Sequence, residues 1–361
     1  MFNNIQMLRA VAAAMVLLYH GAAHYQALGG FELLLNLFSS IGFSGVDIFF
    51  VISGFVAAHT TLHKARTLSN AWTFAKRRLL RIYLGYWPFF VVTLAWISVA
   101  APKALADLHI VSSFFLATIE LQRLVIYVTW SLTFELLFYA LVTASFSLSA
   151  RCVQRFVHGL GLAVFAVLVW TYATPHSPLL LFVSMLLEFL AGVIVYIHRA
   201  KLKSRVWIGP CLVAAALAYA LGARLHASDG SVRIFTFGTA AVALVMLAVV
   251  LEQSQTFVAN RFWVALGNSS YTLYLAHLSL LVAFYFLGIR GFLASQPGGV
   301  REAGFFFIWV FVFGSPTGFT SGWKPHFTVG QVLRGHCHRR IGRGSHPTQS
   351  SVIQSGQPPC Q

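Results

Sequence analysis

Charged residues are scarce in this chain. Only 9% of its 361 residues are Asp, Glu, Lys or Arg, whereas 58% are hydrophobic. Since a soluble domain carries about 25% charged residues, this inventory cannot cover a water-exposed surface. Apolar runs recur along almost the whole chain, which predicts helices that cross a membrane, and the short alternating segments of an outer-membrane barrel are absent. The expected fold class is all-α, a polytopic transmembrane helical bundle of about ten spans.

Several signatures of other protein classes are also missing. The four cysteines show no CxxC or other metal-ligand spacing, so neither a disulfide framework nor a metal site is expected. No GxxxxGK[ST], GxGxxG or HExxH motif occurs, which leaves ATP hydrolysis, dinucleotide redox chemistry and zinc-dependent proteolysis without support. The net charge is +16, but the basic residues are scattered between apolar runs. This pattern favours cytoplasmic loops beside the lipid bilayer, with no nucleic acid as a partner.

The apolar runs predict ten spans with a defined orientation. The spans cover residues 5–27, 33–58, 83–100, 130–148, 158–174, 179–198, 206–222, 234–251, 266–288 and a last stretch from about 303. The first run lacks a small-residue cleavage motif, so we interpret it as a span and not as a signal peptide. Segment 109–121 is apolar but short; as a span it would put the basic loop 199–205 outside, against the positive-inside rule. We therefore expect both termini in the cytoplasm.

The sequence changes character near residue 314. From there to the end it contains no acidic residue and no periodic apolar face, and it is rich in Gly, His, Arg, Ser and Pro. Such a composition cannot bury enough apolar surface to offset the entropy of ordering. We expect a transmembrane domain over 1–313 and a disordered basic tail over 314–361. Because the change falls within the tenth expected span, we also hypothesise a shift of reading frame, which resequencing of the locus tests.

Ionisable side chains inside spans are expensive, at least ~2.5 kcal/mol near the centre of a helix, so each is a candidate for function. Arg9 and His20 lie on the first span, eleven residues apart. That separation is close to three helical turns, so the two share one face about 16 Å apart. A lipid-anchoring arginine and a packing histidine remain the alternatives.

Three further ionisable residues lie within spans. Asp47 is halfway along the second span, and a buried carboxylate needs a cation or donor, which predicts an Arg or His on a neighbouring helix. Glu188 lies in the middle of its span, where pairing with an arginine and a chemical role both stay open. His277 forms one polar stripe with Tyr274 and Ser270, which fits interhelical hydrogen bonding as well as it fits a binding site.

A third carboxylate and a basic segment complete the candidates. Glu135 lies just inside the outer end of the fourth span, with Ser131 and Tyr139 on its face at i−4 and i+4. The segment 74–87 is basic and then aromatic, and it enters the third span from the inside. It is either a positive-inside anchor with an aromatic belt, or an edge where arginines give bidentate contacts to the phosphates of a nucleotide-like donor.

Six segments together resemble acyltransferase family 3, and most of all its exopolysaccharide O-acetyltransferase members. The segments are IQMLRAVAAAMVLLYH at 5–20, GVDIFFVISGF at 45–55, FAKRRLLRIYLGYW at 74–87, WSLTFELLFY at 130–139, LLEFLAG at 186–192 and LGNSSYTLYLAH at 266–277. They follow the family's order and spacing over roughly residues 5–290. The family's hallmark, an arginine followed after ten residues by a histidine, is met by Arg9 and His20. Leu84 departs from the pattern, since members often have Pro there, and the last span is not recognisable.

The resemblance implies an activity. It implies ten membrane helices in the inner membrane of a bacterium, with acetyl-CoA or another acyl-CoA as the cytoplasmic donor substrate and no permanently bound cofactor. The acyl group would pass to a sugar hydroxyl of an exopolysaccharide, an O-antigen or a lipid-linked saccharide. The oligomeric state is not specified.

The resemblance also implies roles for individual residues. The catalytic residues would be His20, Arg9 and Glu135. The donor-binding residues would be Arg77, Arg78 and Arg81. Residues that support the site or bind the acceptor would be Asp47, Trp130, Ser131, Glu188, Tyr274 and His277.

In the expected mechanism, His20 acts as general base or as acyl acceptor. Glu135 orients His20 or an acceptor hydroxyl, and Arg9 stabilises negative charge on the donor or the oxyanion. The alternative is a secondary transporter or an exporter of a lipid-linked saccharide, with Asp47, Glu188 and His277 as a proton relay. The sequence shows neither internal repeats nor helices broken by Gly and Pro, which counts against transport.

Overall fold

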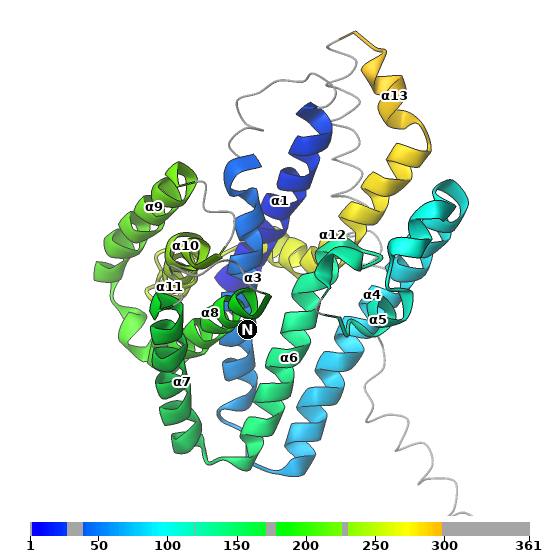
Figure 1. Cartoon of the computed structure of the whole chain (residues 1–361). Coiled ribbons are helices and arrows are strands. Elements are labelled where there is room, and N and C mark those ends of the chain that lie inside the picture. The colour runs from blue at the N-terminus through cyan, green and yellow to red at the C-terminus, as the bar shows by residue number, and fades with distance from the viewer. Residues whose placement is uncertain (1, 27–38, 119, 171–177, 226–229, 298–361) are drawn as a thin grey trace, which may run out of the picture. The chain divides into compact units, whose positions relative to one another are not determined.

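The chain folds as a bundle of helices (Figure 1). This computed structural model describes residues 2–26, 39–118, 120–170, 178–225 and 230–297, and these ranges contain no strand. Eight helices within them are long and apolar enough to cross a membrane. The predicted fold class, an all-α polytopic membrane bundle, is thereby confirmed.

The helices follow the predicted spans closely. The long helices are α1 (Asn3–Gln26), α3 (Gly45–Thr61), α4 (Leu68–Ala100), α6 (Trp130–Ala144), α7 (Ala150–Trp170), α8 (Pro178–His198), α9 (Ile208–Arg224), α11 (Thr239–Gln253) and α12 (Arg261–Phe286). The short helices are α5 (Ile110–Phe115), α10 (Gly230–Arg233) and α13 (Ile289–Ala294), and a π-helical turn, Ile234–Gly238, joins α10 to α11. The 3₁₀ turns are Gly42–Ser44, Pro102–Asp107, Leu121–Arg123, Tyr127–Thr129, Ser145–Ser147, Arg199–Lys203 and Arg205–Trp207. The tenth predicted span and the predicted tail 314–361 lie outside the described residues.

Two predicted boundaries are wrong, and one doubtful segment is resolved. Helix α4 begins at Leu68 instead of residue 83, and α7 begins at Ala150 instead of 158. Hydropathy marks where a chain enters lipid, whereas a helix can continue beyond that point into water. The start of α4 is set by Thr67, whose side chain accepts a hydrogen bond from the backbone N–H of Asn70. The basic segment therefore belongs to a helix and not to a loop. Helix α5 has only six residues, about 9 Å of rise, so segment 109–121 does not provide a spanning helix.

Glycines let the central helices touch backbone to backbone. A Cβ atom on Gly54 of α3 would lie 2.0 Å from the carbonyl oxygen of Phe189 on α8, and one on Gly45 would lie 2.3 Å from the carbonyl oxygen of Ala12 on α1. On the other side of α1, a Cβ on Gly267 of α12 would meet a backbone carbonyl at 2.0 Å. Small residues at such crossings are the usual means of packing membrane helices. Gly45 and Gly54 therefore allow α3 to pack directly against α1 and α8.

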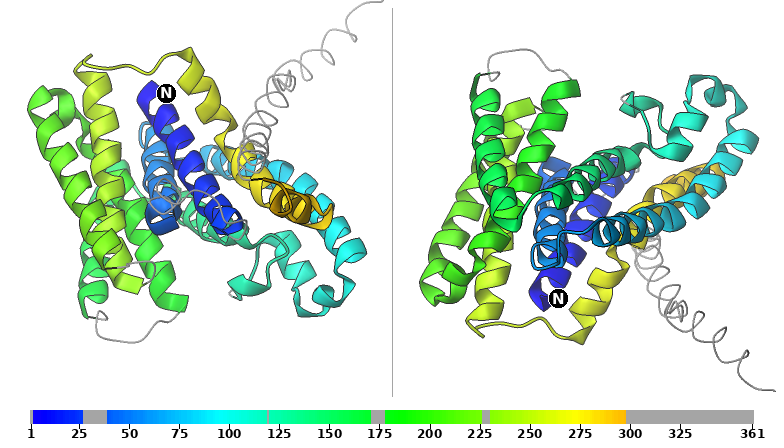
Figure 2. Two further views of the ribbon diagram at one scale, coloured as in Figure 1. Left: turned by 90° about the horizontal axis from the view of Figure 1, so that it is seen from above. Right: turned by 90° about the horizontal axis from the view of Figure 1, so that it is seen from below.

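Helices α1 and α3 occupy the middle of this arrangement. Figure 2 shows them between one group formed by α7, α8, α9 and α11 and another formed by α4, α6 and α12. Helix α1 contacts α3, α11 and α12, and α3 contacts α8 most extensively. Polar side chains on α1 and α3 consequently face protein on both sides, where partners from other helices can reach them.

Candidate active site

A cavity between α1, α3, α4, α6 and α12 gathers many of the predicted site residues. We call it the arginine cavity, and its volume is about 70 Å³. Its polar lining consists of Arg9, Ser53, Arg78, Arg81, Ser131, Glu135, Tyr139, Tyr271 and Tyr274. The rest of the lining is apolar: Val46, Phe49, Phe50, Ile52, Val56 and Leu132. Helices distant in sequence thus meet around one polar site.

The cavity carries an excess of positive charge. Three guanidinium groups, those of Arg9, Arg78 and Arg81, face a single carboxylate, Glu135. The carboxylate accepts hydrogen bonds from the Tyr139 hydroxyl and from Ser53 Oγ, the latter at 3.2 Å. Low-dielectric walls strengthen the field of an unbalanced charge. The arrangement therefore favours an anionic ligand or a group that becomes anionic.

The arginines of α4 are held in place by aromatic rings. The guanidinium of Arg78 lies 5.3 Å from the ring centroid of Phe74 and 5.0 Å from that of Tyr139, and it donates to Thr60 Oγ1 at 3.4 Å. Arg81 lies 5.9 Å from the ring of Tyr271. Such cation–π contacts restrict the orientation of a guanidinium and leave N–H groups for a ligand.

A second hollow adjoins the first. We call it the basic bay; it is lined by His59, Thr60, His63, Lys64, Phe74, Arg77, Arg78 and Arg81. Arg78 and Arg81 line both spaces, so the bay and the arginine cavity meet at these two side chains. The lining of the bay contains no carboxylate. All three predicted donor-binding arginines therefore lie together in one positively charged hollow.

The two histidines of the bundle interior form a pair. The rings of His20 on α1 and His277 on α12 have their centroids 5.1 Å apart. His20 Nδ1 lies 2.9 Å from the carbonyl oxygen of Val16. Because a carbonyl only accepts hydrogen bonds, Nδ1 carries the proton and Nε2 keeps its lone pair. His20 is therefore held in the tautomer that presents Nε2 as a base or a nucleophile.

His277 is fully enclosed. Its side chain is 1% exposed, and the carbonyls of Leu273 and Tyr274 lie near its ring without making hydrogen bonds of good geometry. A buried imidazole with unsatisfied nitrogens is costly. Its retention beside His20 marks it as a second candidate for chemistry at this point.

Glu135 lines the arginine cavity together with Arg9. Arg9 is eleven residues, about 16 Å, from His20 along α1. The two expected roles of Glu135, orienting His20 and orienting a substrate group, both stay predictions.

Tyr274 connects the cavity with the histidine pair. Its hydroxyl donates to the carbonyl of Val128 at 2.6 Å and pairs with Ser131 Oγ at 2.8 Å. Its ring also lies 5.8 Å from the ring of His277. The groups follow one another from the cavity to His20, so the predicted polar stripe on α12 points into the site.

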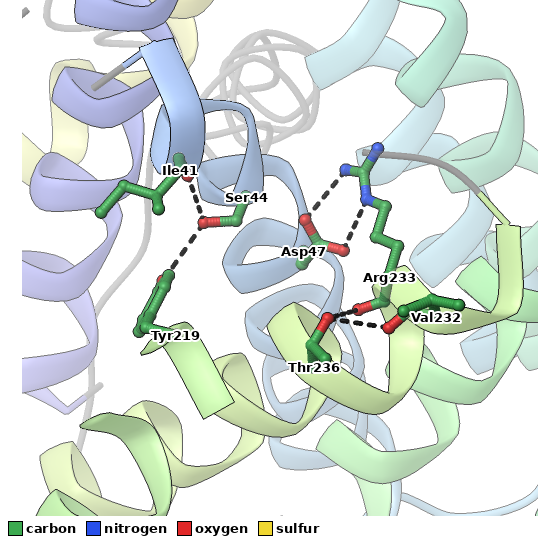
Figure 3. Close-up of polar contacts among 7 residues, drawn as sticks. All are labelled: Ile41, Ser44, Asp47, Tyr219, Val232, Arg233 and Thr236. Atoms are coloured by element: carbon green, nitrogen blue, oxygen red, sulfur yellow. Dashed lines mark hydrogen bonds and ion pairs between the residues drawn. The ribbon is translucent and has the colours of Figure 1, made fainter. Parts of the chain in front are cut away.

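Asp47 and Glu188 belong to a separate cluster. Arg233 donates from Nε to Asp47 Oδ1 at 3.0 Å and from Nη2 to Oδ2 at 2.9 Å (Figure 3), which confirms the predicted cationic partner of Asp47. Glu188 on α8 lies in the same cluster and is 1% exposed, and its oxygens make no hydrogen bond with the described residues. Neither carboxylate lines the arginine cavity.

Some participants were not foreseen from the sequence. Arg233 is the last residue of α10 and immediately precedes the apolar run that predicted the span 234–251. Its position at the edge of that span is the feature of the sequence from which its role could have been found. His63 and Lys64 follow α3 and carry no motif. Trp130 was also predicted at the site. Its ring centroid lies 6.2 Å from that of Phe50, which lines the cavity, so Trp130 packs against a residue of the cavity lining.

Comparison with known proteins places this architecture in a family. The family model described as "Acyltransferase domain", that of acyltransferase family 3, matches residues 2–323. The exopolysaccharide production protein ExoZ of Rhizobium meliloti (strain 1021) is 29% identical over 263 residues, which cover 66% of this chain and 76% of ExoZ. No solved structure matches the chain. The family match includes both hollows and the histidine pair, and the chain therefore belongs to acyltransferase family 3 and is a multi-pass membrane acyltransferase.

Proposed function

We propose that this protein transfers an acetyl group from cytoplasmic acetyl-CoA to a sugar hydroxyl of an exopolysaccharide or a related lipid-linked glycan precursor. The observation that carries the proposal is that Arg78 and Arg81 line both the basic bay and the arginine cavity. A donor with phosphates at one end and an apolar arm at the other matches this pair of hollows. The name of ExoZ, an exopolysaccharide production protein, supports a glycan as the acceptor.

The dimensions of the donor agree with the spacing of the site. The phosphopantetheine arm of CoA has the backbone length of between four and five extended residues, roughly 16 Å at about 3.4 Å per residue. Arg9, which lines the cavity beside Arg78 and Arg81, lies a similar distance from His20 along α1. Phosphates bound by the arginines of α4 would thus leave the thioester near the histidine pair. The apolar lining of the cavity suits the methyl and methylene groups of the arm.

His20 performs the chemistry in this proposal. In direct transfer, Nε2 takes the proton of the sugar hydroxyl, the oxygen bonds to the acetyl carbon, the carbon–sulfur bond breaks and CoA leaves as a thiolate that is then protonated. In a relay, Nε2 bonds to the acetyl carbon while the carbon–sulfur bond breaks and CoA leaves as a thiolate that is then protonated. In the second step the sugar oxygen bonds to the acetyl carbon, the nitrogen–carbon bond breaks, and the hydroxyl proton passes to the released imidazole nitrogen. Both routes use the same nitrogen. The ring of His277, with its centroid 5.1 Å from that of His20, is a neighbouring group able to exchange a proton with it.

Arg9 and Glu135 act on the donor in this proposal. We assign Arg9 to the negative charge of the donor rather than to an oxyanion at His20, because Arg9 lines the arginine cavity together with Arg78 and Arg81. Glu135 accepts from Tyr139 and Ser53 and has capacity to accept an amide N–H of the donor arm. Both residues would then bind and align the arm along the cavity.

The orientation in the membrane follows from the donor's location. Acetyl-CoA is cytoplasmic, so the basic bay and both termini face the cytoplasm of a bacterial cell, and the membrane is the inner one. The scarcity of bases in the opposite loops agrees with the positive-inside rule. The acceptor then approaches His20 from the other side of the bundle.

The test uses inside-out vesicles that contain the protein. Radiolabelled acetyl-CoA is added outside, and label is measured in polysaccharide and in the vesicle lumen, with vesicles carrying His20→Ala as the matched control. Label in polysaccharide that depends on His20 supports the proposal. Uptake of substrate without label in polysaccharide would instead support a transporter and reject acyl transfer.

A further inference from the structure

We infer that the outer end of the basic bay, formed by His63 and Lys64 opposite Arg77, is a subsite for the 3′-phosphate of CoA. This inference rests on the proposed acyl-CoA donor and adds a selectivity that the donor-binding arginines alone do not provide. The enzyme should therefore distinguish CoA from 3′-dephospho-CoA, which differs only in that phosphate.

The order of groups along the donor must match the order of side chains along the site. In CoA the thioester is followed by the pantetheine arm, then the pyrophosphate, and finally the ribose with its 3′-phosphate. In the protein the arginine cavity is followed by Arg78 and Arg81, which it shares with the bay, and then by side chains that line the bay alone. The pyrophosphate therefore falls at the shared arginines. The 3′-phosphate falls among His63, Lys64 and Arg77.

The lining of the outer bay comes from the chain just after α3 and from the helix that follows. Helix α3 ends at Thr61, and the N–H of Lys64 donates to the carbonyl of Thr61 at 3.0 Å, so the chain turns directly after the helix. Helix α4 starts at Leu68 and contributes Arg77 to the same hollow. The short connection 62–67 thus brings Lys64 and Arg77 into one lining.

The charges of the outer bay require a ligand of opposite sign. Lys64 is partly exposed, while His63 and Arg77 are exposed, and no carboxylate lines the bay to neutralise them. The carbonyl end of α3 contributes partial negative charge, so backbone dipoles there do not hold a phosphate. Binding of a phosphate at this point then depends on the cationic side chains. A phosphate monoester, with a charge near −2, is the ligand that gains most from them.

One inner residue of the α3 wall is fixed by packing. The ring of His59 lies 6.2 Å from that of Phe2 and 5.5 Å from that of Tyr196. His63 follows one turn later, with its ring 6.5 Å from that of His59. The inner wall is therefore rigid, and the selectivity is assigned to the outer pair, His63 and Lys64, whose side chains reach solvent and can close on a phosphate.

The experiment compares two donors with two kinds of variant. Initial rates are measured for acetyl-CoA and for acetyl-3′-dephospho-CoA with the parent protein, Lys64→Gln and His63→Gln. The matched control is Lys76→Gln, which removes an exposed lysine from the same helix as Arg77 but from outside the bay. Lys64→Arg tests whether a second cation restores binding. Gel filtration establishes that each variant is monodisperse.

The parent should use acetyl-CoA with a kcat/KM roughly tenfold or more above that of the dephospho donor, mainly through KM, since a charge-assisted contact is made in ground state and transition state alike. Lys64→Gln should raise KM for acetyl-CoA toward that of the dephospho donor and leave the dephospho KM unchanged. Lys64→Arg should recover most of the preference, and Lys76→Gln should behave as the parent. His63→Gln should lose part of the preference.

Two results would overturn the inference. One is a parent that uses both donors equally; the other is a Lys64→Gln variant that raises both KM values by the same factor. Transfer from neither donor would reject the proposed donor and this subsite with it, whereas transfer from both without discrimination rejects only the subsite. Binding of adenosine 3′,5′-bisphosphate, compared with ADP, gives a readout without turnover, and Lys64→Gln should abolish the difference between these two ligands.

Discussion

Removal of the Arg233 guanidinium should destabilise the bundle more than removal of the Asp47 carboxylate, although the two groups form one ion pair. The pair is bidentate, with distances of 3.0 and 2.9 Å, and both side chains are buried. Glu188 lies in the same cluster. In Arg233→Gln, two buried carboxylates lose the guanidinium of their cluster, whereas in Asp47→Asn the arginine remains in the cluster with Glu188.

The magnitudes follow from this asymmetry. Removing one partner of a buried ion pair typically costs about 3–5 kcal/mol of unfolding free energy, which is the expectation for Arg233→Gln. In Asp47→Asn, Glu188 can ionise and replace Asp47 as the negative partner of Arg233, and the loss should resemble that of a single charged hydrogen bond, about 1.5–3 kcal/mol. A difference of about 2 kcal/mol corresponds to roughly 30-fold in the folded-to-unfolded ratio. A second substitution, Glu188→Gln, should recover part of the loss in Arg233→Gln and add to the loss in Asp47→Asn.

The assay is reversible unfolding of purified protein in micelles, with each single variant and each double variant measured under one condition. Arg224→Gln serves as the matched control, because it removes an exposed arginine from the end of α9 and should change stability by less than about 0.5 kcal/mol. Equal losses for Asp47→Asn and Arg233→Gln would refute the three-group account. So would a Glu188→Gln substitution that deepens the loss in Arg233→Gln.

The remaining predictions concern the site and the orientation. Replacing the three arginines of the basic bay together with Gln should raise the donor KM by tenfold or more while kcat stays within about threefold, because phosphate contacts act on ground state and transition state alike. An unchanged KM would show that these arginines only set the orientation of the protein in the membrane. Cysteines introduced at Ser69 and Ala106 should respond differently to an impermeant reagent in intact cells, with only position 106 modified, and the reverse pattern would invert the bundle. Tyr274→Phe should leave the fold intact and slow turnover by about tenfold, since it removes the hydrogen bonds to the Val128 carbonyl and to Ser131 that fix the Tyr274 ring beside His277. Unaltered turnover would show that these two hydrogen bonds are dispensable.

The membrane fold could be predicted from the sequence because its causes are local. A helix that crosses lipid needs about 20 apolar residues, and each such run is visible without knowledge of its neighbours. The same locality explains the errors at Leu68 and Ala150, where helices continue beyond the apolar run. The cationic partner of Asp47 was predictable as a type, since burial demands one, but its identity as Arg233 depends on which helices pack together.

The arrangement of the site was less accessible to sequence analysis. His20 and His277 are separated by most of the chain, and only the packing of α1 against α12 brings their rings together. The placement of Glu135 beside Arg9 depends on the depth and rotation of α6, which hydropathy does not specify. His63 and Lys64 were hidden for another reason: a basic residue after a span is expected for topology alone, so nothing in their sequence distinguishes a binding site.

Acetyl transfer by purified His20→Ala tests the central claim most directly. Alanine keeps helix propensity and removes a polar group from the bundle, so the variant should insert and remain monodisperse. Loss of a positioned acid–base group typically slows a reaction by about 10²–10⁴-fold, and loss of an obligatory nucleophile slows it more. We predict at least a 100-fold loss of transfer from acetyl-CoA per folded molecule, with donor binding retained. Activity within threefold of the parent would contradict the account and remove His20 from the mechanism.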